Sequence, residues 1–161
     1  MKLLLAFVVG SAVLCSVANA SEQAKGASAD REAVKQLVAE FDRCAREKDL
    51  DTFLSYSLDD VVALAPGEPA VVGKAAVRAW YQNFYAVFDV AMVHRPIETD
   101  SFGDLVITRG DATGTIRPVG GGDVVQVGNK YLFVLKRQSD GSLKVWRAMF
   151  NANGQAPQVA K

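Results

Sequence analysis

The spacing of apolar residues changes once along this chain, near Ala91. Before that point, apolar residues recur every three or four positions, which is typical of helices with one buried face. After it, apolar and polar residues alternate in long runs rich in Val, Ile, Thr, Phe and Tyr, which is typical of strands. Helices first and strands afterwards predict an α+β domain.

Three helices and one short strand are expected in the first half. The helical spacing predicts helices over about Asp30–Lys48, Leu50–Tyr56 and Lys74–Val87. Asp30 is a plausible N-cap for the first helix because its side chain can accept from free backbone amides. The short strand is expected over about Val61–Ala65, before a segment with two prolines that ends it.

Long strands fill the second half, and glycine-rich turns separate them. The alternation predicts strands over about Met92–Asp100, Leu105–Arg117, Val124–Arg137 and Leu143–Asn151. Strands of this length curl strongly. The predicted architecture is therefore a cone, in which three N-terminal helices pack on a strongly curved, mainly antiparallel sheet that encloses a pocket.

The N-terminus has the pattern of a secretory signal peptide. Lys2 precedes an apolar stretch over Leu3–Val17, and Ala18-Asn19-Ala20 forms a small-x-small cleavage site. A helix over this stretch spans only about 22 Å, short of the roughly 30 Å of a bilayer core. The expected organisation is a signal peptide at residues 1–20, a flexible tether at 21–29, a domain at 30–153 and a tail at 154–161. The expected destination is the periplasm or the exterior.

Composition excludes several classes of function. The 18 basic and 18 acidic residues balance, which argues against nucleic acid or an anionic membrane surface as a partner. After signal removal, no membrane association is expected. Cys44 is the one cysteine that then remains, and its place on the apolar stripe favours a core position over a nucleophile. With a single histidine, His94, the chain lacks the usual zinc spacing, so no metal or other cofactor is expected.

Four segments carry a resemblance to a known family. They are Asp49-Leu50-Asp51-Thr52-Phe53, Asp59-Asp60-Val61, Gly73-Lys74-Ala75-Ala76-Val77 and the final hairpin KYLFVLKRQSDGSLKVWRAMFNAN. Together they resemble the nuclear transport factor 2-like superfamily, and within it most the exported SnoaL-like family of undefined function. The resemblance covers about Arg31 to Asn153 and implies the cone-shaped fold. It is a weaker guide to chemistry, since one scaffold hosts many sites.

The resemblance also supplies two catalytic sets, and neither is intact in this chain. Ketosteroid isomerases of the superfamily use a carboxylate base, a tyrosine and a protonated aspartic acid. Aligned on the motifs above, these positions hold Ala65, Phe41 and Phe133. Isomerase chemistry of that kind is therefore not expected.

Limonene epoxide hydrolases use an Asp-Arg-Asp set with a tyrosine and an asparagine that position water. Their Arg-x-Asp strand motif resembles Arg109-Gly110-Asp111, but the second acid falls at Ala148. The water-positioning residues fall at Ala63 and Ala65. Two of five positions match, so the set is incomplete.

Three polar residues remain as catalytic candidates: Arg109, Asp111 and His94. Residues two apart on a strand point to one face, so Arg109 and Asp111 could share a pocket. The alternative is a structural ion pair on the outer face. His94 could join the pocket, or it could be a hydrogen-bonded structural histidine. Asp59-Asp60 is interpreted as turn chemistry rather than as a metal or acid pair.

The favoured function is the binding of a small hydrophobic or aromatic molecule in the cone. The expected wall and its polar contacts are Phe41, Trp80, Arg109, Asp111, Tyr131, Phe133, Trp146 and Phe150. One alternative is an isomerase, cyclase or hydrolase with a non-standard site on Arg109 and Asp111. A second is a dimeric assembly module, because a homodimer through the sheet would cover the outward alternates Leu132, Val134, Val145 and Met149.

Overall fold

A computed structural model describes residues 10–154 of the chain, with side chains from Lys25 onward. Helix α1 (Gly10–Glu47) leads into α2 (Leu50–Ser55), strand β1 (Ser57–Leu64), the two-residue strand β2 (Val71–Val72) and helix α3 (Lys74–Val87). Four long strands follow: β3 (Phe88–Phe102), β4 (Leu105–Pro118), β5 (Val125–Arg137) and β6 (Leu143–Ala152). The predicted α+β class is confirmed, and β2 is the element that the periodicity missed.

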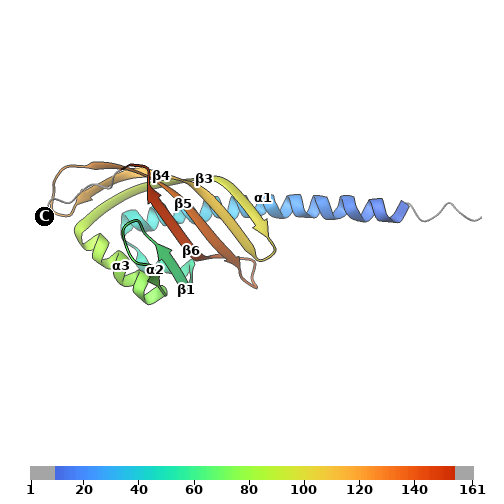
Figure 1. Ribbon diagram of the computed structural model, residues 1–161, viewed down its shortest axis with the longest axis horizontal. Coiled ribbons are helices and arrows are strands. Elements are labelled where there is room, and N and C mark those ends of the chain that lie inside the picture. The colour runs from blue at the N-terminus through green and yellow to red at the C-terminus, as the bar shows by residue number, and fades with distance from the viewer. Residues whose placement is uncertain (1–9, 155–161) are drawn as a thin grey trace, which may run out of the picture.

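One sheet holds all six strands in the order β2-β1-β6-β5-β4-β3. The pairings are antiparallel except that β1 runs parallel to β6. The strands curve around α1, while α2 and α3 lie together at one end of the sheet (Figure 1). This mostly antiparallel, curved sheet with helices on its inner side is the cone that the sequence predicted.

The core lies between the inner face of the sheet and the helices. It contains the apolar stripe of α1 and the inward alternates of the strands: Val34, Leu37, Val38, Phe41, Leu54, Val61, Ala63, Val77, Met92, Val106, Ala112, Tyr131, Phe133, Leu135, Leu143 and Val145. Cys44 is buried beside this stripe, as its spacing predicted. The packing of the apolar stripe of α1 against the sheet fixes the orientation of this helix.

The tight hairpin between β5 and β6 follows the predicted turn chemistry. Gly141 adopts a φ of 83°, a backbone conformation that other residues rarely reach. The Asp140 carboxylate accepts from the Ser142 amide at 2.9 Å, which closes the turn. This turn sets the register of the two strands that carry much of the inner wall.

Helix α1 begins well before the predicted start, so Asp30 is not an N-cap. Its carboxylate is buried and accepts two hydrogen bonds from Arg137 Nη2, at 2.7 and 2.8 Å, and one from Ser101 Oγ. A charged group on the buried stripe needs such partners, and here they come from β3 and β5. Asp30 thus joins α1 to the sheet rather than ending the helix.

The N-terminal half of α1 projects beyond the sheet (Figure 1). Residues 21–29, predicted as a flexible tether, lie within this helix in a chain that still carries its N-terminal segment. Of the predicted signal peptide, residues 1–9 lie outside the described residues, as does nearly all of the predicted tail. Cleavage, the tether of the mature chain and export stay predictions. No helix in the described part of the chain is both long and apolar enough to cross a bilayer.

Candidate active site

Arg109 and Asp111 point to the outer face of the sheet. Their β4 neighbours Thr108, Gly110 and Ala112 are buried on the inner face, and alternation sends the intervening side chains outward. Of the two interpretations that the sequence left open, the geometry matches the outer-face one. The inner wall is therefore built without this pair.

Each residue of that pair has its own partner on β3. Arg109 Nε donates to Glu98, and the Arg109 side chain is 55% exposed. Asp111 accepts from Arg95 Nη2 at 3.4 Å. Exposed ion pairs of this kind contribute only about 0–1 kcal/mol to stability.

Trp146 also lies outside the cone, although alternation predicted it inside. The β5–β6 register shifts between Val134 and Leu135, which pair with Arg147 and Val145. Trp146 is the extra residue of this bulge, so the alternation of inward and outward side chains along β6 is reversed there. The same bulge places Val145, predicted to point outward, in the core.

On the outer face Trp146 joins a polar cluster. Its indole Nε1 donates to Asp60 Oδ2 at 2.9 Å. The Lys136 ammonium lies 3.6 Å from the ring centroid, and the Arg147 guanidinium carbon lies 4.0 Å from it. Cation–π contacts of this kind stabilise the exposed ring modestly.

Asp59 and Asp60 lie within β1 rather than in a turn, so the turn interpretation was wrong. The strand register shifts between Ser57 and Val62, which leaves both acids exposed. Asp59 pairs with Lys74 at 2.8 Å, and the pKa of its carboxyl is lowered because Lys74 donates to the ionised form. The two acids therefore serve separate surface contacts.

The other predicted wall residues do meet inside the cone. Phe41 packs edge-on against Phe133, with ring centroids 6.2 Å apart, and Phe133 stacks on Tyr131 at 4.5 Å. Trp80 of α3 approaches Phe150 of β6 at 6.2 Å. These five side chains come from α1, α3, β5 and β6, and ring contacts through Phe53 and Tyr81 join them into one aromatic group.

His94 brings a polar side chain against this aromatic group. It lies on the inner side of β3 beside Met92, and its ring meets Tyr131 edge to face at a centroid distance of 5.3 Å. His94 Nδ1 lies 2.6 Å from Asp42 Oδ1, and the His94 backbone amide donates to Asp42 Oδ2 at 2.9 Å. Both oxygens of one buried carboxylate thus hold one histidine.

This arrangement decides the tautomer of the ring. An ionised carboxylate can only accept, so the proton of the 2.6 Å contact belongs to Nδ1. In the neutral ring, Nε2 then carries the free lone pair. The His94 side chain keeps 20% exposure, so it is not sealed from solvent. A histidine oriented in this way by a carboxylate can accept a proton from a bound molecule.

The Tyr131 hydroxyl lies beside this pair, and the three residues are called the Asp42–His94–Tyr131 cluster. It is buried and has no hydrogen-bond partner among the residues that the structure describes. Burial, reinforced by the nearby Asp42 carboxylate, raises the pKa of Tyr131 well above its usual range, so the hydroxyl keeps its proton. Leaving such a group unpaired costs about 1–3 kcal/mol.

Gly110 makes room for this hydroxyl. A Cβ at position 110 would lie 2.6 Å from the Tyr131 hydroxyl oxygen and 2.2 Å from the Arg95 carbonyl oxygen. Gly110 lies beside the β3–β4 register shift between Pro96 and Glu98, where β3 bends toward it. The glycine in the predicted Arg-x-Asp motif therefore faces the cone, while its charged neighbours do not.

Sequence reasoning missed Asp42. Its signal is its position on the apolar stripe of the first helix, four residues after Val38 and twelve after Asp30. Acids on a buried stripe need partners from another element, and both Asp30 and Asp42 have them. The partner of Asp42 is 52 residues away in the sequence, so only the fold shows the pair.

No group of three or more His, Cys, Asp or Glu side chains converges on a possible metal position within residues 25–154. Leu132 and Met149 are 40% and 48% exposed on the outer face of the sheet, as alternation predicted. The homodimer through that face stays a prediction.

Comparison with known proteins agrees with the fold and its cone. Residues 34–148 match the model of the SnoaL-like domain, and the chain belongs to that family. No curated protein matches the sequence.

Solved structures with the same fold share little sequence with the chain. A ketosteroid isomerase-like protein from Erwinia carotovora atroseptica is 23% identical, with a TM-score of 0.68, over 78% of this chain and 94% of that one. An ntf2-like protein with a cystatin-like fold from Novosphingobium aromaticivorans is 15% identical, with a TM-score of 0.64, over 93% and 94%. ActVI-ORFA from Streptomyces coelicolor is 12% identical, with a TM-score of 0.65, over 76% and 96%. Such likenesses define the nuclear transport factor 2-like fold and leave the chemistry to the residues of this chain.

Proposed function

We propose that this protein binds a small, flat, mainly apolar molecule in its cone, with one oxygen of that molecule against Tyr131 and His94. The Asp42–His94–Tyr131 cluster carries the proposal, because it places polar groups within an otherwise aromatic lining. Apolar pockets with a few convergent polar groups are typical of small-molecule sites. The Tyr131 hydroxyl would donate to a carbonyl or phenol oxygen.

The test compares 2-naphthol with naphthalene by isothermal titration calorimetry. One added hydrogen bond contributes about 1 kcal/mol, so 2-naphthol should bind roughly five-fold tighter. Tyr131→Phe keeps the aromatic ring and should abolish this difference. Arg109→Ala, on the outer face, should leave both affinities unchanged.

Two results would contradict the proposal. One is equal affinity for the two compounds in the unmodified protein. The other is a loss of binding in Arg109→Ala together with full binding in Tyr131→Phe, which would move the site to the outer face.

Proton transfer is a second candidate function, and the orientation of His94 by Asp42 favours it. A base held through Nδ1 presents Nε2 to a substrate, and the Tyr131 hydroxyl can stabilise negative charge that develops on an oxygen. This candidate is an enzyme that removes a proton next to a carbonyl group, the step common to many isomerases and cyclases.

Deuterium exchange at the α-carbons of 2-tetralone, followed by proton NMR, tests this candidate. The exchange should be faster with the protein than with buffer, and His94→Gln should remove the increase. Asp42→Asn should slow the exchange by about 10²-fold or more, because Asn can present its amide nitrogen and favour the wrong tautomer. Exchange at the wild-type rate in His94→Gln would exclude a base at this position.

A further inference from the structure

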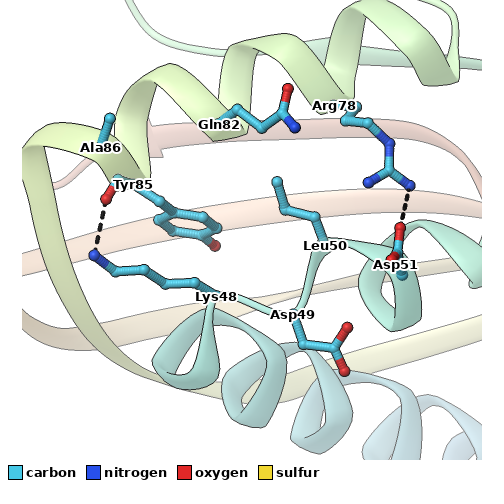
Figure 2. A pocket seen from close by; sticks show the side chains of 8 residues that line it. All are labelled: Lys48, Asp49, Leu50, Asp51, Arg78, Gln82, Tyr85 and Ala86. Atoms are coloured by element: carbon cyan, nitrogen blue, oxygen red, sulfur yellow. Dashed lines mark hydrogen bonds and ion pairs between the residues drawn. The ribbon is translucent and has the colours of Figure 1, made fainter.

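A pocket of about 410 Å³ opens between the α1–α2 junction and α3. Figure 2 shows its walls, with Lys48 and Leu50 on one side and Arg78, Gln82 and Tyr85 on the other. None of these residues belongs to the Asp42–His94–Tyr131 cluster. The volume lies within the roughly 300–1,000 Å³ range of small-molecule sites.

A tyrosine hydroxyl and a glutamine amide contribute polar atoms to this pocket. Tyr85 is only 7% exposed, and its hydroxyl lies beside Leu50 inside the pocket (Figure 2). Neither this hydroxyl nor the Gln82 amide is hydrogen-bonded to another lining residue in Figure 2. A hydroxyl and an amide can each both donate and accept, so the two groups suit the polar part of a ligand in this pocket.

The charged groups of the pocket are already balanced. Arg78 Nη2 lies 2.8 Å from Asp51 Oδ1, and the Asp51 side chain is otherwise exposed. Lys48 Nζ donates to the Tyr85 carbonyl at 2.8 Å and pairs with Asp89 at 2.9 Å. With each cation matched by a carboxylate, the pocket offers little net field to attract an ion.

Lys48 has a backbone conformation that links it to this pocket. Its φ of 57° is in the left-handed region, where no other non-glycine residue of the described chain lies. Glycine is the usual residue at such a helix end. The lysine side chain instead reaches α3, so this position forms a wall of the pocket as well as the end of α1.

The pocket combines accepting and donating groups with the apolar side chain of Leu50. The Asp51 carboxylate accepts, Arg78 donates, and the Gln82 amide and Tyr85 hydroxyl do both. Neighbouring hydroxyl groups on a ring need this combination, and the Leu50 side chain can contact the C–H face of that ring. We propose that this pocket is a binding site for a neutral polyhydroxylated molecule of the size of a sugar, independent of the cone.

The test titrates the isotope-labelled protein with D-glucose, D-galactose and myo-inositol, and follows its backbone amides by NMR. At least one polyol should shift the amides of residues 48–51 and 78–86 in a saturable way, with a Kd of roughly 1 mM. Sodium phosphate and glycine betaine, an anion and a zwitterion, should not.

Matched variants locate the site. Gln82→Ala and Tyr85→Phe should each weaken polyol binding about five-fold, the value of one hydrogen bond. Gln126→Ala removes another exposed glutamine, on β5 and far from the pocket residues in sequence, and should change nothing. The proposal is overturned if no polyol shifts these amides, if phosphate or betaine binds in their place, or if Gln82→Ala binds like the unmodified protein.

Discussion

Replacing Asp30 with asparagine should destabilise this fold far more than changing another acid on the same helix. The Asp30 side chain is 5% exposed and accepts from Arg137 on β5 and from Ser101 on β3. Asparagine keeps one oxygen but loses the charge and one acceptor. Arg137 then loses one hydrogen bond and the opposite charge of its partner.

The magnitude follows from the burial of the two partners. Removing one member of a fully buried pair costs about 3–5 kcal/mol. Because Arg137 keeps 31% exposure, water compensates in part, and we expect a loss of about 2 kcal/mol. With a typical urea dependence, this lowers the midpoint of unfolding by about 1 M.

Glu32→Gln is the matched control. Glu32 pairs with Lys35 at 3.4 Å on the exposed side of α1, where both side chains are more than half exposed. Its loss should cost less than about 0.5 kcal/mol. Urea unfolding followed by circular dichroism measures both variants in one assay.

A double-mutant cycle separates the ion pair from simple packing. If Asp30 acts through Arg137, the double variant Asp30→Asn/Arg137→Gln should lose much less stability than the sum of the losses in the two single variants. Additive losses, or an Asp30→Asn variant within about 0.5 kcal/mol of the unmodified protein at an unchanged urea slope, would refute the reasoning.

Two further predictions concern the core and the inner wall. Burial raises the pKa of the Cys44 thiol, so less reactive thiolate is present at any given pH. In a chain without residues 1–20, Ellman's reagent at pH 8 should react with this thiol at least about 100-fold faster after unfolding in urea than in the native state. A fast reaction in the native state would place the thiol in solvent. Gly110→Ala should cost about 1–3 kcal/mol, because its Cβ would collide with the Arg95 carbonyl. Gly128→Ala is the control, because its Cβ would meet nothing nearer than 3.7 Å, and it should change stability by less than about 1 kcal/mol in the same urea assay. Equal losses of stability in the two variants would contradict the steric explanation for Gly110→Ala.

Much of the architecture could be predicted from local pattern. Helix α3 was predicted with its observed bounds, and the predicted ends of β4, β5 and β6 all agree to within one residue. Their apolar periods are long and unbroken, and periodicity is most reliable in that case. Strand β2 escaped because a two-residue strand has no period.

The candidate site was only half predictable. Phe41, Tyr131 and Phe133 were assigned to the inner wall because simple alternation or helical spacing holds around them. Trp146 was placed on the wrong face, because one bulged residue reverses the parity of a strand and leaves no reliable mark in the sequence.

The sequence by itself determined the fold class, the positions of α3 and β4–β6, the aromatic character of the inner wall and the place of Cys44 in the core. Each follows from short-range periodicity, which one stretch of chain contains in full. Only the tertiary structure decided that Asp42 holds His94, that Tyr131 lies over Gly110, and that Arg109 and Asp111 face outward. Those relations depend on strand register and on how α1 lies against the sheet, and both are set by contacts between residues far apart in the chain.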